Sequence, residues 1–261
     1  MQKLHFSYEM QIGYAEPVER CNYTIKCFPK DNKRQTIHDI QISLVPNTLY
    51  LEGHDGLLNK QIYGINEVPH YTFTFRLDGS ATVGLADYEE DENENLDMIF
   101  NHPHGLNVAG DTIKAFLKNN MPENSLDARG KALSMMHRLH EVMTYEPFIT
   151  NVKTTAEEAF SMKKGVCQDY AHIFIALMHL LKIPARYVTG LIVGEGASHA
   201  WAEILMDGKW YGFDPTNDKI VADEHVKIGV GRDARDCMIN RGIMHGGGPQ
   251  SQEISVKVEP Y

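Results

Sequence analysis

The sequence predicts an α+β protein, in which an N-terminal antiparallel β-sandwich is followed by helices and then a second antiparallel sheet. Three observations predict this arrangement. The first 85 residues contain short β-rich runs between turn residues, a strongly acidic run follows at 86–98, and the hydrophobic period changes from that of strands to that of helices after residue 111. The 261 residues are enough for one large domain or two modest ones.

The β-rich runs of the N-terminal region contain many Ile, Tyr, Thr, Phe and Val residues. Part of this region alternates clearly, with Ile40, Ile42 and Leu44 separated by Gln41 and Ser43. Such alternation is typical of a strand with one buried face, so we expect a small antiparallel sandwich. The expected strands are "CNYTIKCF", "TIHDIQISLVP", "NTLYLEGHDG", "NKQIYGI" and "YTFTFRLDGSATVGL".

The acidic run at 86–98 contains seven acids and no basic residue. A run of this kind is usually solvated and loop-like. We therefore expect a domain boundary in or just after it, which divides the chain into an N-terminal β-sandwich domain (1–100) and a second domain (101–261).

The second region begins with segments of helical period. One short helix has both ends indicated, because Thr155 and Glu158 form a capping-box pattern and Gly165 follows its basic last turn. A very apolar helix then begins near Cys167 and stops before Pro184. The expected helices are "DTIKAFLKNNM", "SLDARGKALSMMHRLHEVMTY", "TTAEEAFSMKKG" and "KKGVCQDYAHIFIALMHLL", and the strands expected after them are "ARYVTGLIVG", "HAWAEILMDGKWYGF", "HVKIGVG" and "EISVKVEP".

Composition argues against two classes of partner. The hydrophobic share of 43% and the charged share of 23% are ordinary for a soluble globular protein. The formal net charge of -10 argues against binding to nucleic acid or to an anionic membrane surface. We find no apolar run that resembles a signal peptide or a membrane span.

The four cysteines show no CxxC pair and are too widely spread for a disulfide framework, so we expect free thiols and a reducing, cytoplasmic setting. They are Cys21, Cys27, Cys167 and Cys237.

Cys167 has the position that thiol catalysis needs. At a helix N-terminus, unpaired backbone N–H groups and the helix dipole favour a thiolate. The alternative is a buried structural cysteine, which is a frequent role for a free thiol.

A catalytic thiol also needs a base and a group that orients the base. His199 opens one expected strand, and Asp214 ends the next one, 15 residues later. A hairpin can bring these two side chains together, so that the carboxylate holds the imidazole. Taken alone, His199 could be a core histidine and Asp214 could simply start an Asp-Pro turn.

Several motifs resemble those of the transglutaminase-like superfamily, and in particular a bacterial subgroup of candidate cysteine proteases with an N-terminal β domain. The motifs are "GVCQDYAH", "IPARYVTG", "SHAWAEI", "WYGFDPTN", "HVKIGVGRDARD" and "RGIMHGGG". The resemblance is strong over residues 145–250 and implies a papain-like core. It also implies that Cys167 is the nucleophile, His199 the base and Asp214 the orienting acid.

Other residues near this constellation have supporting roles in our interpretation. The backbone N–H of Cys167 is the expected first oxyanion donor, and Tyr145 is a candidate second donor. Gln168 is a weaker candidate, and Trp201 is expected to pack around the hairpin. We expect Asp169, in the first turn of the helix, to be structural.

We expect no metal and no cofactor. His172 and His179 lie one heptad apart on the apolar helix, but further ligands at compatible spacing are lacking.

The predicted reaction is cysteine-dependent acyl transfer from, or hydrolysis of, a peptide or carboxamide through a thioester on Cys167. Hydrolysis is favoured over crosslinking, because water is always available and nothing indicates an amine site. The expected partner is a peptide, protein or amide substrate, and the sequence does not indicate an oligomeric state. The alternative is a catalytically silent module that binds a peptide in the same cleft.

Overall fold

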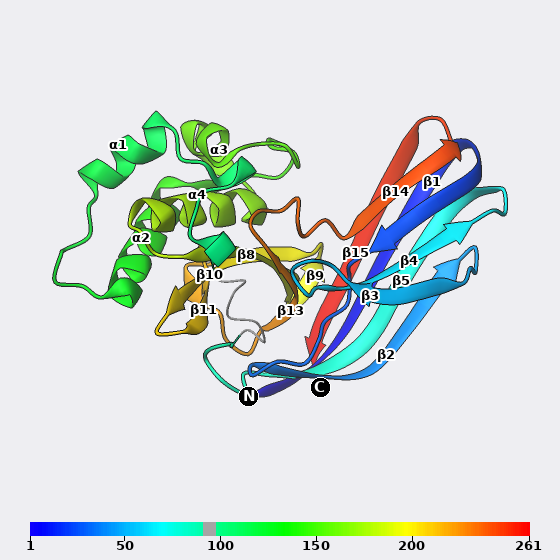
Figure 1. Ribbon diagram of the computed structural model, residues 1–261, viewed down its shortest axis with the longest axis horizontal. Helices are drawn as coiled ribbons and strands as arrows, with labels where there is room; N and C mark the ends of the chain where they lie inside the picture. Colours follow the sequence, from blue (N-terminus) through cyan, green and yellow to red (C-terminus); the bar gives the residue numbers. More distant parts are fainter. Residues whose placement is uncertain (91–97) are drawn as a thin grey trace.

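The computed structural model describes residues 1–90 and 98–261. Within this part of the chain, the fold contains two large antiparallel sheets and a group of helices, so the predicted α+β class is confirmed (Figure 1). The helices pack on one side of the second sheet, and the first sheet lies on the other side (Figure 1). None of the helices in the described residues is long and apolar enough to cross a membrane.

The first sheet is organised by one very long strand, β1 (Gln2–Ile25). Its first half pairs with β5 and β15, whereas its second half, beyond a register shift between Gly13 and Val18, pairs with β4 and β14. The predicted N-terminal antiparallel architecture therefore takes the form of one continuous sheet whose two parts share an apolar core. Its other strands are β2 (Gln35–Val45), β3 (Tyr50–His54), β4 (Lys60–Asn66), β5 (His70–Val83), β9 (Gly194–Gly196), β14 (Asn240–Gly246) and β15 (Gln250–Pro260).

The C-terminal strands correct one prediction. The sequence interpretation placed "EISVKVEP" in the sheet of the second region, but β15 lies between β1 and β9 in the first sheet (Figure 1). Val256 and Val258 are buried in the first-sheet core, which explains this position. The proposed division into 1–100 and 101–261 remains a prediction, and it would separate β15 from its hydrogen-bonding partner β1.

The second sheet has the strand order β12-β11-β10-β8-β13. Its β10–β11 hairpin turns at Asp207 and Gly208, which both have positive φ, as a tight two-residue turn requires. The strands are β8 (Ala185–Ile192), β10 (His199–Met206), β11 (Lys209–Asp214), β12 (Lys219–Ile220) and β13 (His225–Gly231).

The helices agree with their predicted positions. The capping box of α3 is present in both directions, since the Glu158 carboxylate accepts the Thr155 N–H and the Thr155 hydroxyl accepts the Glu158 N–H. Its left-handed C-cap is Lys163 rather than the expected Gly165. The helices are α1 (Asp111–Asn119), α2 (Ala128–Val142), α3 (Ala156–Met162), α4 (Cys167–Leu180) and the short η2 (Gly105–Asn107).

The acidic run is partly different from the prediction. Residues 91–97 of this run lie outside the described residues. Glu89, however, is buried rather than solvated: it exchanges backbone hydrogen bonds with Trp210, and its carboxylate pairs with Lys227. A buried carboxylate needs such a partner, because desolvation of an unpaired charge is costly.

Candidate active site

Cys167 is the first residue of α4, as predicted. The short strand β7 (Lys164–Gly165) lies just before Cys167 in the chain and pairs in parallel with β6 (Thr144–Tyr145). The thiol is partly exposed, whereas the helix from Asp169 to Met178 is buried. A helix leaves the N–H groups of its first turn without intrahelical partners. The cysteine is therefore at an electropositive helix end that a rigid core holds in place.

Asp169 stabilises the N-terminal end of α4 through hydrogen bonds. Its Oδ2 atom accepts the Val166 N–H at 2.8 Å and the Thr150 hydroxyl at 2.6 Å. Burial raises the pKa of Asp169, and these two hydrogen bonds offset part of that effect. A Cβ atom on Gly165 would come within 2.6–2.9 Å of the Asp169 side chain, so this position needs glycine. The contacts agree with the structural role expected for Asp169.

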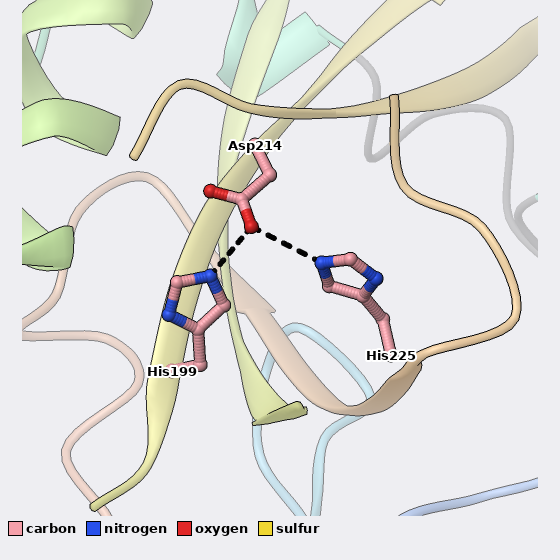
Figure 2. Close-up of side chains that lie close together, drawn as sticks. All are labelled: His199, Asp214 and His225. Atoms are coloured by element: carbon pink, nitrogen blue, oxygen red, sulfur yellow. Dashed lines mark hydrogen bonds and ion pairs between the residues drawn. The ribbon is translucent and has the colours of Figure 1, made fainter. Parts of the chain in front are cut away.

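His199 and Asp214 are brought together by the β10–β11 hairpin. The hairpin register pairs Ala202 with Phe213, which leaves His199 and Asp214 at the same open end of the two strands. The Nε2 atom of His199 lies 2.7 Å from Oδ2 of Asp214 (Figure 2). Asp214 is fully buried, and its Oδ1 atom accepts backbone N–H groups from Thr216 and Asn217.

Cys167 lies close enough to His199 to contribute to the raised pKa of that histidine. Burial alone would lower the pKa of His199, but the hydrogen bonds with Asp214 and Cys167 and their charges raise it to about 10. For Asp214, burial would raise the pKa, yet hydrogen bonds from His199 and His225 hold it well below its usual range. The arrangement favours an imidazolium beside an ionised carboxylate.

His225 is a site residue that the sequence interpretation missed. Its Nε2 atom lies 3.2 Å from the same Asp214 oxygen, on the side opposite His199 (Figure 2). Burial lowers the pKa of His225, and its hydrogen bond to the Asp214 carboxylate offsets this in part. One signal was available: His225 and Lys227 interrupt the apolar run "HVKIGVG" at alternate positions, which places both on one face of a strand.

The three predicted supporting residues lie at different places around the site. Tyr145 pairs with Gly165 across β6 and β7, and its hydroxyl interacts electrostatically with Cys167; burial is the main cause of its raised pKa. Trp201 is buried, with its ring 6.1 Å from that of His199. Gln168 lies partly buried in the first turn of α4.

Three side chains of the site could in principle hold a metal ion, because His199, Asp214 and His225 offer ligand atoms within 4.8 Å of one another. The 2.7 Å between His199 and Asp214 is a hydrogen-bond distance. Two ligands of a tetrahedral zinc ion lie further apart, at about 3.4 Å. The donor set thus fits a hydrogen-bonded group better than a zinc site. His172 and His179 form hydrogen bonds with backbone groups of Ala234 and Phe100, respectively.

Comparisons with known proteins support the resemblance read from the motifs. Residues 115–215 match the family model of the transglutaminase-like superfamily. An uncharacterized protein of Mycobacterium leprae is 35% identical over 126 residues, which cover 44% of this chain and 45% of that protein. An uncharacterized protein of Mycobacterium tuberculosis is 32% identical over 141 residues, or 48% of this chain and 45% of that protein. The matches thus span less than half the length of these curated relatives.

The whole fold recurs in a solved structure. The crystal structure of a candidate cysteine protease from Cytophaga hutchinsonii superimposes with a TM-score of 0.82 and 20% sequence identity. The alignment covers 99% of this chain and 90% of that one, so the first sheet and the helical core are both shared. The predicted combination of a large antiparallel sheet with a helical core is therefore confirmed as a fold, and residues 115–215 match the transglutaminase-like family model.

Proposed function

We propose that this chain, which carries a transglutaminase-like domain at 115–215, is a cysteine-dependent enzyme that hydrolyses a peptide or carboxamide bond. Cys167 is the nucleophile, His199 the acid and base, and Asp214 the group that orients His199. The observation that carries the proposal is the His199–Asp214 hydrogen bond, with Cys167 close to His199 at the N-terminus of α4. The family match supports a cysteine-dependent activity in general.

The first half of the reaction forms a thioester. The thiolate of Cys167 attacks the substrate carbonyl carbon, and a C–S bond forms as the carbonyl oxygen takes up negative charge. With its pKa raised to about 10, His199 is an imidazolium at neutral pH, and it gives its proton to the departing nitrogen as the C–N bond breaks. Asp214 holds Nε2, which directs the other ring nitrogen away from the carboxylate (Figure 2).

In the second half, the now neutral His199 takes a proton from water while that water attacks the thioester carbonyl. The C–S bond breaks, the acid product leaves, and the thiolate–imidazolium pair is restored. A primary amine in place of this water would give crosslinking. Hydrolysis is our proposal, because water is present throughout and no feature of the described residues indicates a lysine-binding site.

Two groups can stabilise the negative oxygen of the intermediate. The Cys167 N–H belongs to the first turn of α4, where the helix itself supplies no acceptor. Tyr145 lies beside this turn, with a half-exposed side chain whose hydroxyl interacts with Cys167. We propose these two as the oxyanion donors, since a preorganised donor near the developing charge is the usual source of such stabilisation.

Alkylation by iodoacetamide tests the nucleophile. We expect carboxamidomethylation of Cys167 to remain fast as the pH falls to about 6, where an ordinary thiol is almost fully protonated. His199→Gln should remove this reactivity at pH 6. The matched controls are the other three thiols, whose pKa is raised by burial and which should stay unmodified in the folded protein: Cys21, Cys27 and Cys237. Peptide mapping by mass spectrometry resolves the four sites.

A panel of peptide amides tests the reaction. We expect ammonia or amine release by the wild-type protein and none by Cys167→Ala, with circular dichroism showing that the variant is folded. Addition of a primary amine should leave the acid as the main product. Predominant amide exchange would instead identify a crosslinking enzyme. A slow, ordinary Cys167 together with peptide binding would identify a catalytically silent module.

A further inference from the structure

Asp214 is held by two histidines, and His225 has no part in the reaction described above. The His225 side chain is almost completely buried, and its Nε2 atom lies 3.2 Å from Oδ2 of Asp214 (Figure 2). An ionised carboxylate only accepts hydrogen bonds, so Nε2 of His225 must carry the proton and donate it. In a neutral imidazole the other nitrogen, Nδ1, is then an acceptor. It has no partner among the described residues.

A small cavity lies next to this ring. Its volume is about 10 Å³, which is roughly the space that one water molecule requires. The residues around it include Arg34, Gln35, Trp201, Glu203, His225 and Lys227. The cavity therefore lies between Arg34, just before β2, and His225 of the candidate active site.

Two residues that line the cavity also carry a polar atom that lacks a partner in the described part of the chain. These atoms are Nη1 of Arg34 and Nε1 of Trp201, both of them donors on side chains that are more than nine-tenths buried. The Arg34 guanidinium is fixed by its other nitrogen, which donates to the Val221 carbonyl at 2.7 Å. The Trp201 ring meets that of His225 edge-on at 5.2 Å. Buried polar groups left unpaired are costly, so three of them around one cavity point to a ligand.

We propose that one buried water molecule occupies this cavity, accepts hydrogen bonds from Arg34 and Trp201, and donates one to His225. The water keeps His225 in the tautomer that donates to Asp214, and His225 is thereby a positioning residue for His199. Water fits the wall better than chloride, because an anion cannot donate to Nδ1 and because the Glu203 carboxylate also lines the cavity. The kinetic consequence rests on the proposed function, but the water site does not.

Crystallography and NMR test the water site directly. We expect a crystal structure at about 1.3 Å resolution to show a water oxygen within about 3.2 Å of all three orphan atoms. The ring ¹⁵N spectrum of His225 should show a protonated Nε2 and an unprotonated Nδ1. Trp201→Phe, which removes only the indole donor, should shift the Nδ1 resonance. An anomalous chloride peak, a dry cavity or a protonated Nδ1 would overturn the proposal.

Variants of His225 test its positioning role. We expect His225→Leu to slow alkylation of Cys167 at pH 6 and peptide turnover by about tenfold, the loss of one hydrogen bond to a charged group. His225→Gln keeps an N–H donor and should recover part of this loss at unchanged KM. His179→Gln is the control, because His179 lies 12 residues after Cys167 on α4, about 18 Å along the helix axis.

The outcomes of these experiments separate the two proposals. Wild-type rates in His225→Leu, or an equal loss in His179→Gln, would refute the positioning role. If the wild-type protein cleaves no amide and Cys167 is unreactive, the proposed function fails, while the water position and the His225 tautomer still decide the water site.

Discussion

A single oxygen atom of Asp214 organises the candidate active site. Its Oδ2 atom faces His199, His225 and the Asn217 side-chain amide at 2.7, 3.2 and 2.7 Å. These donors explain how a fully buried carboxylate can remain ionised, because each hydrogen bond replaces part of its lost hydration. The ionised carboxylate in turn raises the pKa of His199.

We expect Asp214→Asn to lower the pKa of His199 from about 10, because the variant loses the negative charge of the carboxylate and weakens the hydrogen bond that His199 donates to it. Titration of the ring nitrogen resonances by NMR measures this value. His172 is an internal reference: burial lowers its pKa to about 4, and it should titrate at the same pH in both proteins. An unchanged His199 titration would show that Asp214 does not control its charge.

The same pair predicts how stability depends on pH. The folded-state pKa of His199 lies above its unfolded value of 6.5, so its contribution is full below pH 6.5 and disappears as the pH rises through about 10. The pKa of Asp214 lies below its unfolded value of 3.8, so its contribution is present above that pH and is lost in stronger acid. Urea unfolding should therefore show the largest cost of Asp214→Asn, about 3 kcal/mol, near pH 5, and a smaller one at pH 9. A cost that grows toward pH 9 would contradict this account.

At the scale of elements, the start of α4 depends on a close backbone approach. Gly165 lies directly against the Asp169 side chain, and that carboxylate holds the Val166 N–H one residue before Cys167. Because α4 is buried beyond this point, the helix cannot move away to make room. The position of Cys167 is therefore set by the contacts of Gly165 and Val166 with Asp169.

We expect Gly165→Ala to destabilise the fold by about 1–3 kcal/mol and to slow alkylation of Cys167, since the added Cβ would displace Asp169. Gly56→Ala is the matched control, because a Cβ there has no neighbour within 4 Å and the change should cost less than about 0.5 kcal/mol. Urea unfolding and the alkylation rate measure the two effects. Equal stability of the two variants would show that the close approach at Gly165 is not important.

Local signals explain why much of this arrangement could be predicted from the sequence. The Asp207–Gly208 turn and the strands on either side of it predict the hairpin that joins His199 to Asp214. The capping pattern predicts α3, and the apolar run beginning at Cys167 predicts α4. All of these are encoded within about 20 neighbouring residues, where propensity and periodicity are informative.

The features that could not be predicted depend on contacts between distant segments. The strand β15 pairs with β1, which lies at the opposite end of the sequence. Nothing in the segment "EISVKVEP" indicates which of the two sheets it joins. Glu89 belongs to an acidic run that predicts a solvated loop, but it is buried because Lys227, 138 residues later, pairs with it. His225 is close to Asp214 only because β13 pairs with β8 rather than following the hairpin.

At the scale of the whole molecule, β13 joins the two sheets. Its side chains alternate, so that Val226 and Ile228 enter the first-sheet core while His225 and Lys227 point the other way. Lys227 then pairs with Glu89 and with Glu203. Burial would raise the pKa of Glu203, but the charges of Lys227 and Arg186 lower it to about 2. One strand thus contributes to the first-sheet core, to the buried charge cluster and to the candidate active site.

This shared strand predicts that the two sheets unfold together. Val256→Ala with Val258→Ala removes buried groups from β15 and should destabilise the protein by about 3 kcal/mol. Lys257→Ala, at an exposed site on the same strand, should change stability by less than about 0.5 kcal/mol. The loss in the double variant should appear as one transition, because the first-sheet core contains side chains of both sheets.

Two buried thiols report on this directly, since Cys27 lies in the first-sheet core and Cys237 in the core around α4. Alkylation during a urea titration should expose both at the same urea concentration, in the wild-type protein and in the double variant. Exposure of Cys27 well before Cys237 would show that the first sheet unfolds by itself. In that case the active-site region would be an independent domain, as the division at residue 100 predicts.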